Sequence, residues 1–173
     1  QLDAWHWNDA VVKENDGIHM EFPSSFKRSG SWFEPGTIEA NKEYTKEIAE
    51  INTFFQNAKV YNATVAKERN LIFEATKSLF SGEQTLFIHA NEEKQMIDAI
   101  QLAKSNGITK IAIVGGYEAY KIGSFLKENK IGVLLKRVHG MPENDDDDID
   151  LPFKLAKLLT DQGVVVGLEN SGA

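Results

Sequence analysis

Histidines and carboxylates are the side chains of this sequence best suited to chemistry. The four histidines are His6, His19, His89 and His139. His89 follows the apolar run 86–88 and precedes a helical pattern, so we expect it at the carboxyl end of a strand. An imidazole in that position either caps a helix or bonds to a loop, or it acts as a metal ligand or proton-transfer group. His89 alone does not decide between these roles.

Other candidates occupy the equivalent position after other expected strands. In parallel α/β folds, functional residues gather at the carboxyl ends of the strands. Those positions hold Gly115 and Gly116, the stretch 137–139 that ends in His139, and the stretch 169–171 that begins with Glu169. The glycine pair could expose backbone N–H groups to an anion. It lacks the G-x-G-x-x-G spacing and the P-loop lysine, so a tight turn is the simpler interpretation.

An acidic run, "ENDDDDID" over 143–150, raises the question of a calcium site. It has neither the alternating ligands nor the central glycine of an EF-hand loop. Adjacent aspartates repel one another, which favours a solvated loop. Its last member, Asp150, is expected to cap a helix that begins at Leu151 or Pro152.

The elements that would position these residues alternate regularly. Strands are expected at 85–88, 110–114, 131–135 and 164–168, with a helix after each of the first three. The strands carry nearly continuous Ile, Val and Leu, which is typical of parallel strands covered on both faces. The pattern predicts an α/β fold with a parallel sheet, but it does not separate a barrel from an open sheet.

The first half of the chain is less regular. A short strand is expected at 17–22, ended by Pro23, and a loop rich in Ser, Gly and Pro at 23–36. Apolar residues at helical spacing from Ile38 to Tyr61 predict a helix, and 71–80 predicts a second one that ends at Gly82.

Composition narrows the class of protein. The 173 residues carry a formal charge of −7 with a pI near 5.1, which argues against nucleic-acid or anionic-membrane partners. Cysteine is absent, which excludes disulfides and thiolate metal sites but does not choose between cytoplasm and periplasm. No apolar run approaches the roughly 20 residues of a membrane span. We expect a soluble protein with a small-molecule substrate.

Three stretches together resemble a known family. "LDAWHWNDAVVKENDGIHMEFP", "LFIHANEEKQMIDAIQLAKSNGITKIAIVGGYEAYKIGSFLKENKIGVLL" and "DDDIDLPFKLAKLLTDQGVVVGLENSG" resemble the imidazolonepropionase-like branch of the amidohydrolase superfamily. The resemblance implies a TIM (β/α)8 barrel that hydrolyses a C–N bond, usually of a cyclic amide, with one or two divalent metals at its rim. It also implies that residues 1–173 form a single partial barrel domain that lacks the first strands, a piece of a longer chain.

The resemblance assigns roles to particular residues. His89 matches the fifth-strand histidine that binds metal, zinc being the expected ion. The sixth-strand histidine has no match, since Gly115 and Gly116 stand there. The eighth-strand aspartate, a base, falls at Glu169, Asn170 or Ser171 depending on register, and Glu169 is the one that could serve. Gly115, Gly116 and His139 are candidates for the substrate pocket.

These observations leave three functions open. The intact protein is a metal-dependent amidohydrolase, a catalytically degenerate barrel that binds a small molecule, or an open-sheet domain that binds a phosphorylated ligand at the glycine pair. We favour the first, and we expect the 173-residue chain alone to be inactive and to hold zinc weakly or not at all. Because a partial barrel leaves sheet edges open, we also expect it to form homo-oligomers.

Overall fold

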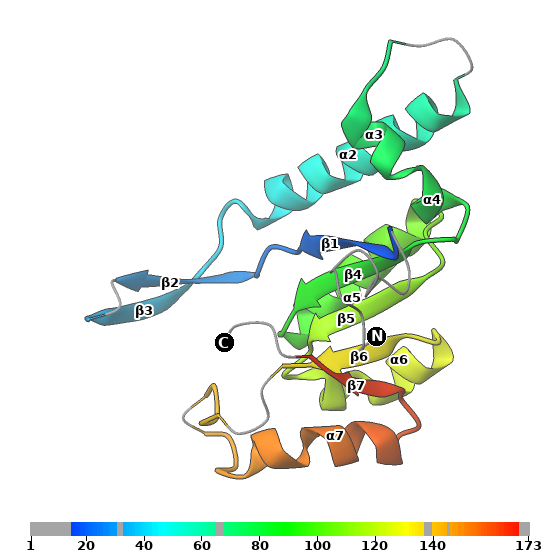
Figure 1. Ribbon diagram of the computed structural model, residues 1–173. Helices are drawn as coiled ribbons and strands as arrows, with labels where there is room; N and C mark the ends of the chain where they lie inside the picture. Colours follow the sequence, from blue (N-terminus) through cyan, green and yellow to red (C-terminus); the bar gives the residue numbers. More distant parts are fainter. Residues whose placement is uncertain (1–14, 31–32, 65–67, 137–139, 145, 170–173) are drawn as a thin grey trace, which may run out of the picture.

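A five-stranded parallel sheet forms the centre of the molecule (Figure 1). The structure is a computed structural model and describes residues 15–30, 33–64, 68–136, 140–144 and 146–169. The strand order is β1-β4-β5-β6-β7, and every neighbouring pair is parallel. The strands are β1 (Gly17–Glu21), β4 (Thr85–Ala90), β5 (Ile111–Gly115), β6 (Gly132–Leu135) and β7 (Val166–Leu168). The predicted α/β class and parallel sheet are therefore confirmed, and β1 matches the short strand expected at 17–22 and pairs with β4.

Helices pack on one face of this sheet. They are α5 (Glu93–Ser105), the short 3-10 helix η1 (Ala119–Ile122), α6 (Gly123–Glu128) and α7 (Leu151–Asp161). On α5, Met96, Ile100 and Ala103 fall at helical spacing and are fully buried. They belong to the same hydrophobic core as Leu86 and Ile88 of β4. Burial of these residues supplies the main driving force for folding.

The other face of the sheet is more open than the sequence predicted. Along β4, Leu86 and Ile88 are buried, whereas Thr85, Phe87 and His89 are only partly buried. This alternation follows from the pleat, which points successive side chains to opposite faces. The prediction that the strands are covered on both faces therefore fails for β4, whereas on β5 the consecutive residues Ile113 and Val114 are both buried. The face that carries Phe87 and His89 is called the open face below.

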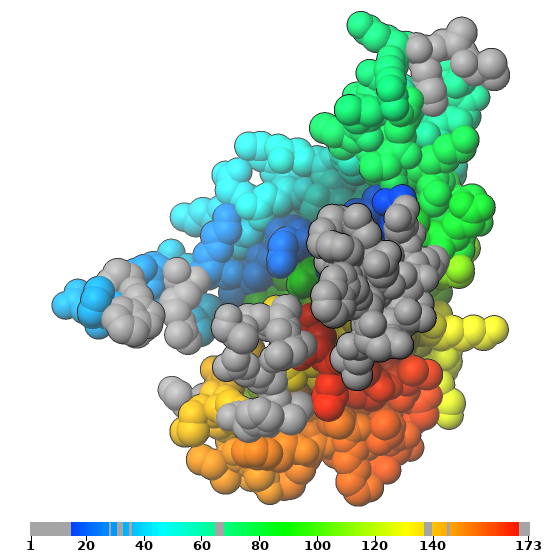
Figure 2. All heavy atoms as spheres, in the orientation of Figure 1, coloured from blue at the N-terminus to red at the C-terminus, as the bar shows by residue number. Residues whose placement is uncertain are grey.

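The structure of the segment between β1 and α2 differs from two predictions. Residues 23–36 were expected to be a loop and a helix was expected from Ile38, but an antiparallel hairpin forms from β2 (Phe26–Gly30) and β3 (Pro35–Ala40). Phe26 and Ile38 are 54% and 60% exposed, so their apolar side chains mark no buried helix face. Figure 2 shows the hairpin projecting from the body of the molecule.

Three helices follow the hairpin. Helix α2 (Tyr44–Ala63) begins six residues later than the Ile38 start that the sequence suggested. The predicted helix 71–80 is divided into α3 (Leu71–Ala75) and α4 (Lys77–Phe80). Thr76 lies between them, and its hydroxyl donates to the Phe73 carbonyl at 2.7 Å. Gly82 follows α4 with a φ of +75°, a left-handed conformation that glycine favours after a helix.

Among the described helices α2 is the longest at 20 residues, and charged side chains interrupt its apolar ones. None of the helices in the described ranges is both long and apolar enough to cross a bilayer.

Candidate functional site

The candidate residues at the strand ends share one edge of the sheet. Parallel pairing aligns His89 with Val114, Val114 with Leu134, and Leu134 with Gly167. Gly115 ends β5, and Glu169 follows β7 and donates its N–H to the Leu135 carbonyl at 2.9 Å. His89, the glycine pair and Glu169 therefore lie at the same edge, as strand polarity predicted. His139 lies outside the described residues.

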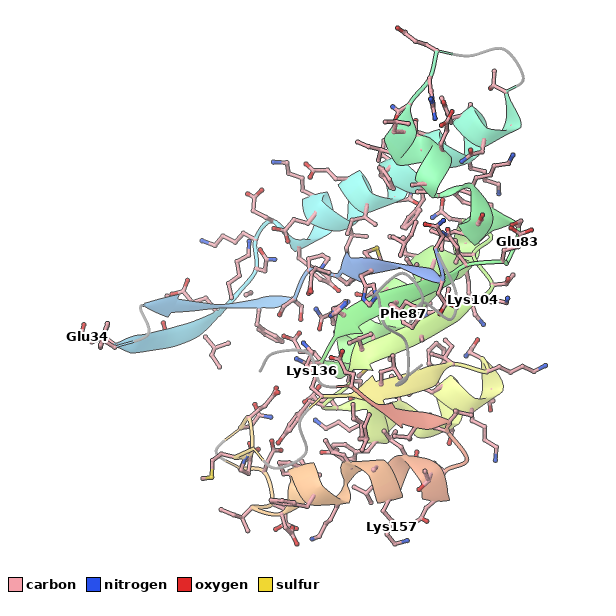
Figure 3. The ribbon with its side chains drawn as sticks, in the orientation of Figure 1. Glu34, Glu83, Phe87, Lys104, Lys136 and Lys157 are labelled. Atoms are coloured by element: carbon pink, nitrogen blue, oxygen red, sulfur yellow. The ribbon has the colours of Figure 1, made fainter. Side chains whose placement is uncertain are left out.

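His89 is the last but one residue of β4, rather than a residue after the strand. Its neighbours come from β1, where Glu21 pairs with His89 and His19 pairs with Phe87. The two strands place all four side chains on the open face, because the paired positions alternate with Leu86 and Ile88, which are buried on the opposite face. Figure 3 labels Phe87 on this face and Lys136 at the carboxyl end of β6.

Two histidines and a glutamate make up the contact, which we call the His19–His89–Glu21 cluster. The Nδ1 atom of His19 lies 2.9 Å from the Nε2 atom of His89. On the other side of the ring, an oxygen of Glu21 lies 3.4 Å from the Nδ1 atom of His89. The His89 side chain is only 16% exposed, whereas that of Glu21 is 84% exposed. His19 also stacks on Phe87, with ring centroids 4.8 Å apart and planes 17° apart.

This geometry favours one arrangement of protons. A neutral imidazole carries one N–H, and its other nitrogen accepts. The Glu21 carboxylate favours the proton on His89 Nδ1, which leaves His89 Nε2 as an acceptor. His19 then donates its Nδ1–H to that nitrogen. The cluster consequently presents two imidazole nitrogens at one point on the open face.

Sequence reasoning identified His89 but gave no role to His19 or Glu21. A signal was available, because His19 and Glu21 are two residues apart and must share one face of a strand. Their relation to His89 depends on the parallel pairing of β1 with β4. That pairing joins segments about 70 positions apart and has no local signature.

The glycine pair forms a tight turn, as the simpler interpretation predicted. Gly115 and Gly116 have φ values of +97° and +64°, which non-glycine residues rarely adopt. The Gly116 N–H donates to the Ala90 carbonyl at 2.8 Å, so it is not available to a phosphate. This hydrogen bond argues against an anion site at the pair.

The acidic loop is attached to the same edge of the sheet by Tyr117. The Tyr117 hydroxyl donates to Asp147 at 2.7 Å and accepts from the Glu143 N–H at 3.0 Å. Burial, and then the hydrogen bond to Asp147, raise the pKa of Tyr117 to about 12. The same hydrogen bond, with further ones from Asn144, holds the pKa of Asp147 below its ordinary value. Asp147 is thus anchored to the fold rather than simply solvated.

Asp150 occupies the N-cap position of α7, as predicted, but its side chain makes no capping hydrogen bond. It pairs instead with Lys154 at 2.6 Å. The interaction with Lys154 lowers the pKa of Asp150.

His19 of the cluster also lines a cavity of ≈ 550 Å³. It lies between β1 and the helices α2 to α4, and apart from His19, Glu50 and Thr76 its lining is apolar. The lining includes Ile18, Met20, Phe54, Phe55, Leu79 and Leu86. The size and apolar character are those of a small-molecule pocket.

A complete metal centre is not assembled by the part of the chain that the structure describes. Within it, no group of three or more His, Cys, Asp or Glu side chains is placed to hold a metal ion. A zinc site needs about three protein ligands, and the cluster offers two imidazoles.

Comparison with known proteins supports the fold. No protein-family model and no curated protein sequence matches this chain. Among solved structures, the chain is similar to an amidohydrolase from Thermotoga maritima MSB8, with a TM-score of 0.70 and 21% sequence identity. The match covers 93% of this chain and 43% of that one, so the chain spans less than half the length of that protein. The fold is therefore amidohydrolase-like, and at this identity the similarity speaks for the fold alone.

Proposed function

We propose that this chain is part of a metal-dependent amidohydrolase that cleaves a C–N bond of a cyclic amide or related small molecule. The observation that carries the proposal is the His19–His89–Glu21 cluster at the carboxyl edge of a sheet with an amidohydrolase-like fold. The imidazolonepropionase-like branch and the closed (β/α)8 barrel are finer parts of the same proposal. They rest on the sequence resemblance.

The cluster suits a divalent metal in part. His89 Nε2 and His19 Nδ1 would be the ligands, with the His19 proton moved to its Nε2 atom so that both facing nitrogens offer a lone pair. Their separation of 2.9 Å is close to the ~3.3 Å expected for two nitrogens on a tetrahedral zinc. Glu21 lies where a carboxylate commonly orients a ligating histidine through its other nitrogen. The remaining ligands would come from outside the described residues. When bound, such a metal polarises a carbonyl and activates water.

The other roles depend on how the sheet closes. Glu169 would be the base, with Gly115, Gly116 and His139 near the substrate. Three strand spacings of about 4.8 Å separate β4 from β7, and Glu169 lies two residues beyond the position in register with His89, so a flat sheet would hold the two residues roughly 16 Å apart. Curvature toward a barrel would shorten that distance, so the proposed role of Glu169 requires the closed barrel.

A second function is favoured by two features of the same region. The turn at Gly115 and Gly116 provides no ligand side chain, and the apolar cavity beside His19 is large enough for a small molecule. A catalytically degenerate barrel that binds a small molecule would have these properties. The phosphate-binding alternative is disfavoured, because the Gly116 N–H is already bonded to Ala90.

Titration of the 173-residue chain with Zn²⁺ and Co²⁺ tests the metal proposal. Two imidazoles should give weak binding, at about micromolar dissociation constants or above, which His19→Ala and His89→Ala each remove. Glu83→Gln, an exposed carboxylate at the amino end of β4, is the control and should leave it unchanged. Binding that survives both substitutions, or none up to millimolar metal, would contradict the proposal.

A further inference from the structure

A buried glutamine joins the two strands that carry the cluster. Gln95 lies in the first turn of α5 and is 7% exposed. Its Nε2 group donates to the Phe22 carbonyl at 2.6 Å. Its Oε1 atom accepts from the N–H groups of Asn91 at 2.9 Å and Glu92 at 3.3 Å. The donor and the acceptor of the Gln95 amide therefore both form hydrogen bonds. The donor binds the segment that contains Phe22, and the acceptor binds the segment that contains Asn91 and Glu92.

These two segments are the direct continuations of β1 and β4. Phe22 follows Glu21, and Asn91 is two residues after His89. Phe22 also donates its N–H to the His89 carbonyl at 3.2 Å. Gln95 consequently fixes the ends of both strands within one or two residues of the cluster.

Only half of this arrangement serves the helix. The bonds from Oε1 to the start of α5 belong to a capping box, a common way to satisfy a helix N-terminus. The bond from Nε2 to Phe22 lies outside that motif and adds nothing to the cap. It ties down β1, which within the described residues is an edge strand held by β4 on one side only.

A second link runs in parallel with the first. Glu92 accepts hydrogen bonds from Ser24 and Ser25, which follow β1. These groups lie nearer the surface than Gln95, and water competes with their bonds more readily. Of the two connections between α5 and the end of β1, the one through Gln95 is the buried one.

We infer that Gln95 is a positioning residue that holds His19 and Glu21 against His89. Its biological meaning rests on the proposed function, but the contact it maintains is a property of the chain alone. A loss of the Nε2 bond should let the end of β1 move relative to β4 and separate the two imidazoles, while the rest of the sheet keeps its structure.

Ring-nitrogen NMR of the metal-free 173-residue chain at a single pH tests this inference. The variants are Gln95→Glu, which keeps an acceptor but loses the donor, and Gln95→Met, which removes both. Gln101→Glu and Gln101→Met are matched controls at an exposed position of the same helix. The shifts of unpaired rings are obtained from His89 in His19→Ala and from His19 in His89→Ala.

In both Gln95 variants the His19 and His89 ring nitrogens should move to these unpaired values, while backbone amides of β5, β6 and α7 keep theirs. The Gln101 variants should match the wild type. Wild-type ring shifts in a folded Gln95→Met variant would overturn the inference. So would general unfolding of Gln95→Met, since Gln95 would then support the whole fold rather than the cluster. Failure of the wild type to bind metal would sink the proposed function and leave this result intact.

Discussion

At the scale of single residues, Glu21 is the member of the cluster whose interaction depends most on the solvent. Its carboxylate faces His89 Nδ1 but is largely exposed, so water and salt screen the interaction. Partners that orient a metal-bound histidine typically change affinity by about 10–100-fold. We expect Glu21→Gln to weaken Zn²⁺ binding by no more than about tenfold, the low end of that range.

Calorimetric titration at low and high salt checks this expectation, and the difference between variant and wild type should shrink at high salt. Glu83→Gln, an exposed carboxylate at the amino end of β4, is the matched control (Figure 3). A loss of a hundredfold or more for Glu21→Gln would mean that the carboxylate binds the metal directly.

The burial of Tyr117 and its hydrogen bond to Asp147 make stability depend on pH in two windows. Asp147 has a lowered pKa in the folded state, so its contribution is present above its ordinary value of 3.8 and lost as pH falls through the folded value. Tyr117 has a raised pKa, so its contribution is present below 10.0 and lost as pH rises through about 12.

Tyr117→Phe should therefore cost about 1 kcal/mol at neutral pH, the net worth of one hydrogen bond. Urea denaturation across the pH range measures the difference from the wild type. It should shrink at the acid end and again at the alkaline end. A difference that stayed constant from pH 3 to pH 12 would assign the cost to packing alone.

At the scale of elements, the turn after β5 leaves no room for a side chain. A Cβ at Gly116 would lie 2.7 Å from Val133 Cγ1, and the backbone there has a φ of +64°. Both the contact and the conformation penalise any other residue. We expect Gly116→Ala to lower the free energy of unfolding by about 2 kcal/mol.

The matched control is Gly140→Ala, where an added Cβ would meet nothing within 4 Å. Urea denaturation of both variants is the measurement. Equal stabilities for the two alanine variants would show that the turn relaxes and that its geometry does not constrain the carboxyl edge.

Prediction from sequence worked where the signal was local. Helix α7 occupies 151–161 as expected, and β4, β5 and β6 follow apolar runs that are largely buried. The hairpin was missed because Phe26 and Ile38 are exposed and so carry no periodic burial. Half of the candidate site was missed for a different reason. His19 and Glu21 acquire a role only through the pairing of β1 with β4, which no local pattern encodes.

At the scale of the whole molecule, the sheet has two edges within the described residues, and both strands there are short. At the β7 edge, Val165 is 78% exposed and Leu168 is 69% exposed. Exposed apolar edges of this kind favour strand pairing between copies. We therefore expect self-association at micromolar concentration, measured by light scattering after size exclusion.

Val165→Lys should shift the chain toward the monomer, because a charge at an edge strand opposes pairing. Val60→Lys, at a 67% exposed position on α2, is the control and should not change the mass. A monomeric wild type would contradict the expectation and would mean that the described edges do not drive association.

The separation of His19 and His89 by 70 positions has a consequence for the order in which the protein folds. The units from β4 to β7 join neighbours in sequence and can form early, whereas the contact with β1 must close a long intervening segment. The cluster should therefore be among the last features to appear during folding. In return, closure entropy grows only slowly with length, by about 0.6 kcal/mol per doubling. The exposed hairpin within that segment can accordingly be lengthened or rebuilt at little cost to the cluster, which makes it the natural place for new specificity to evolve.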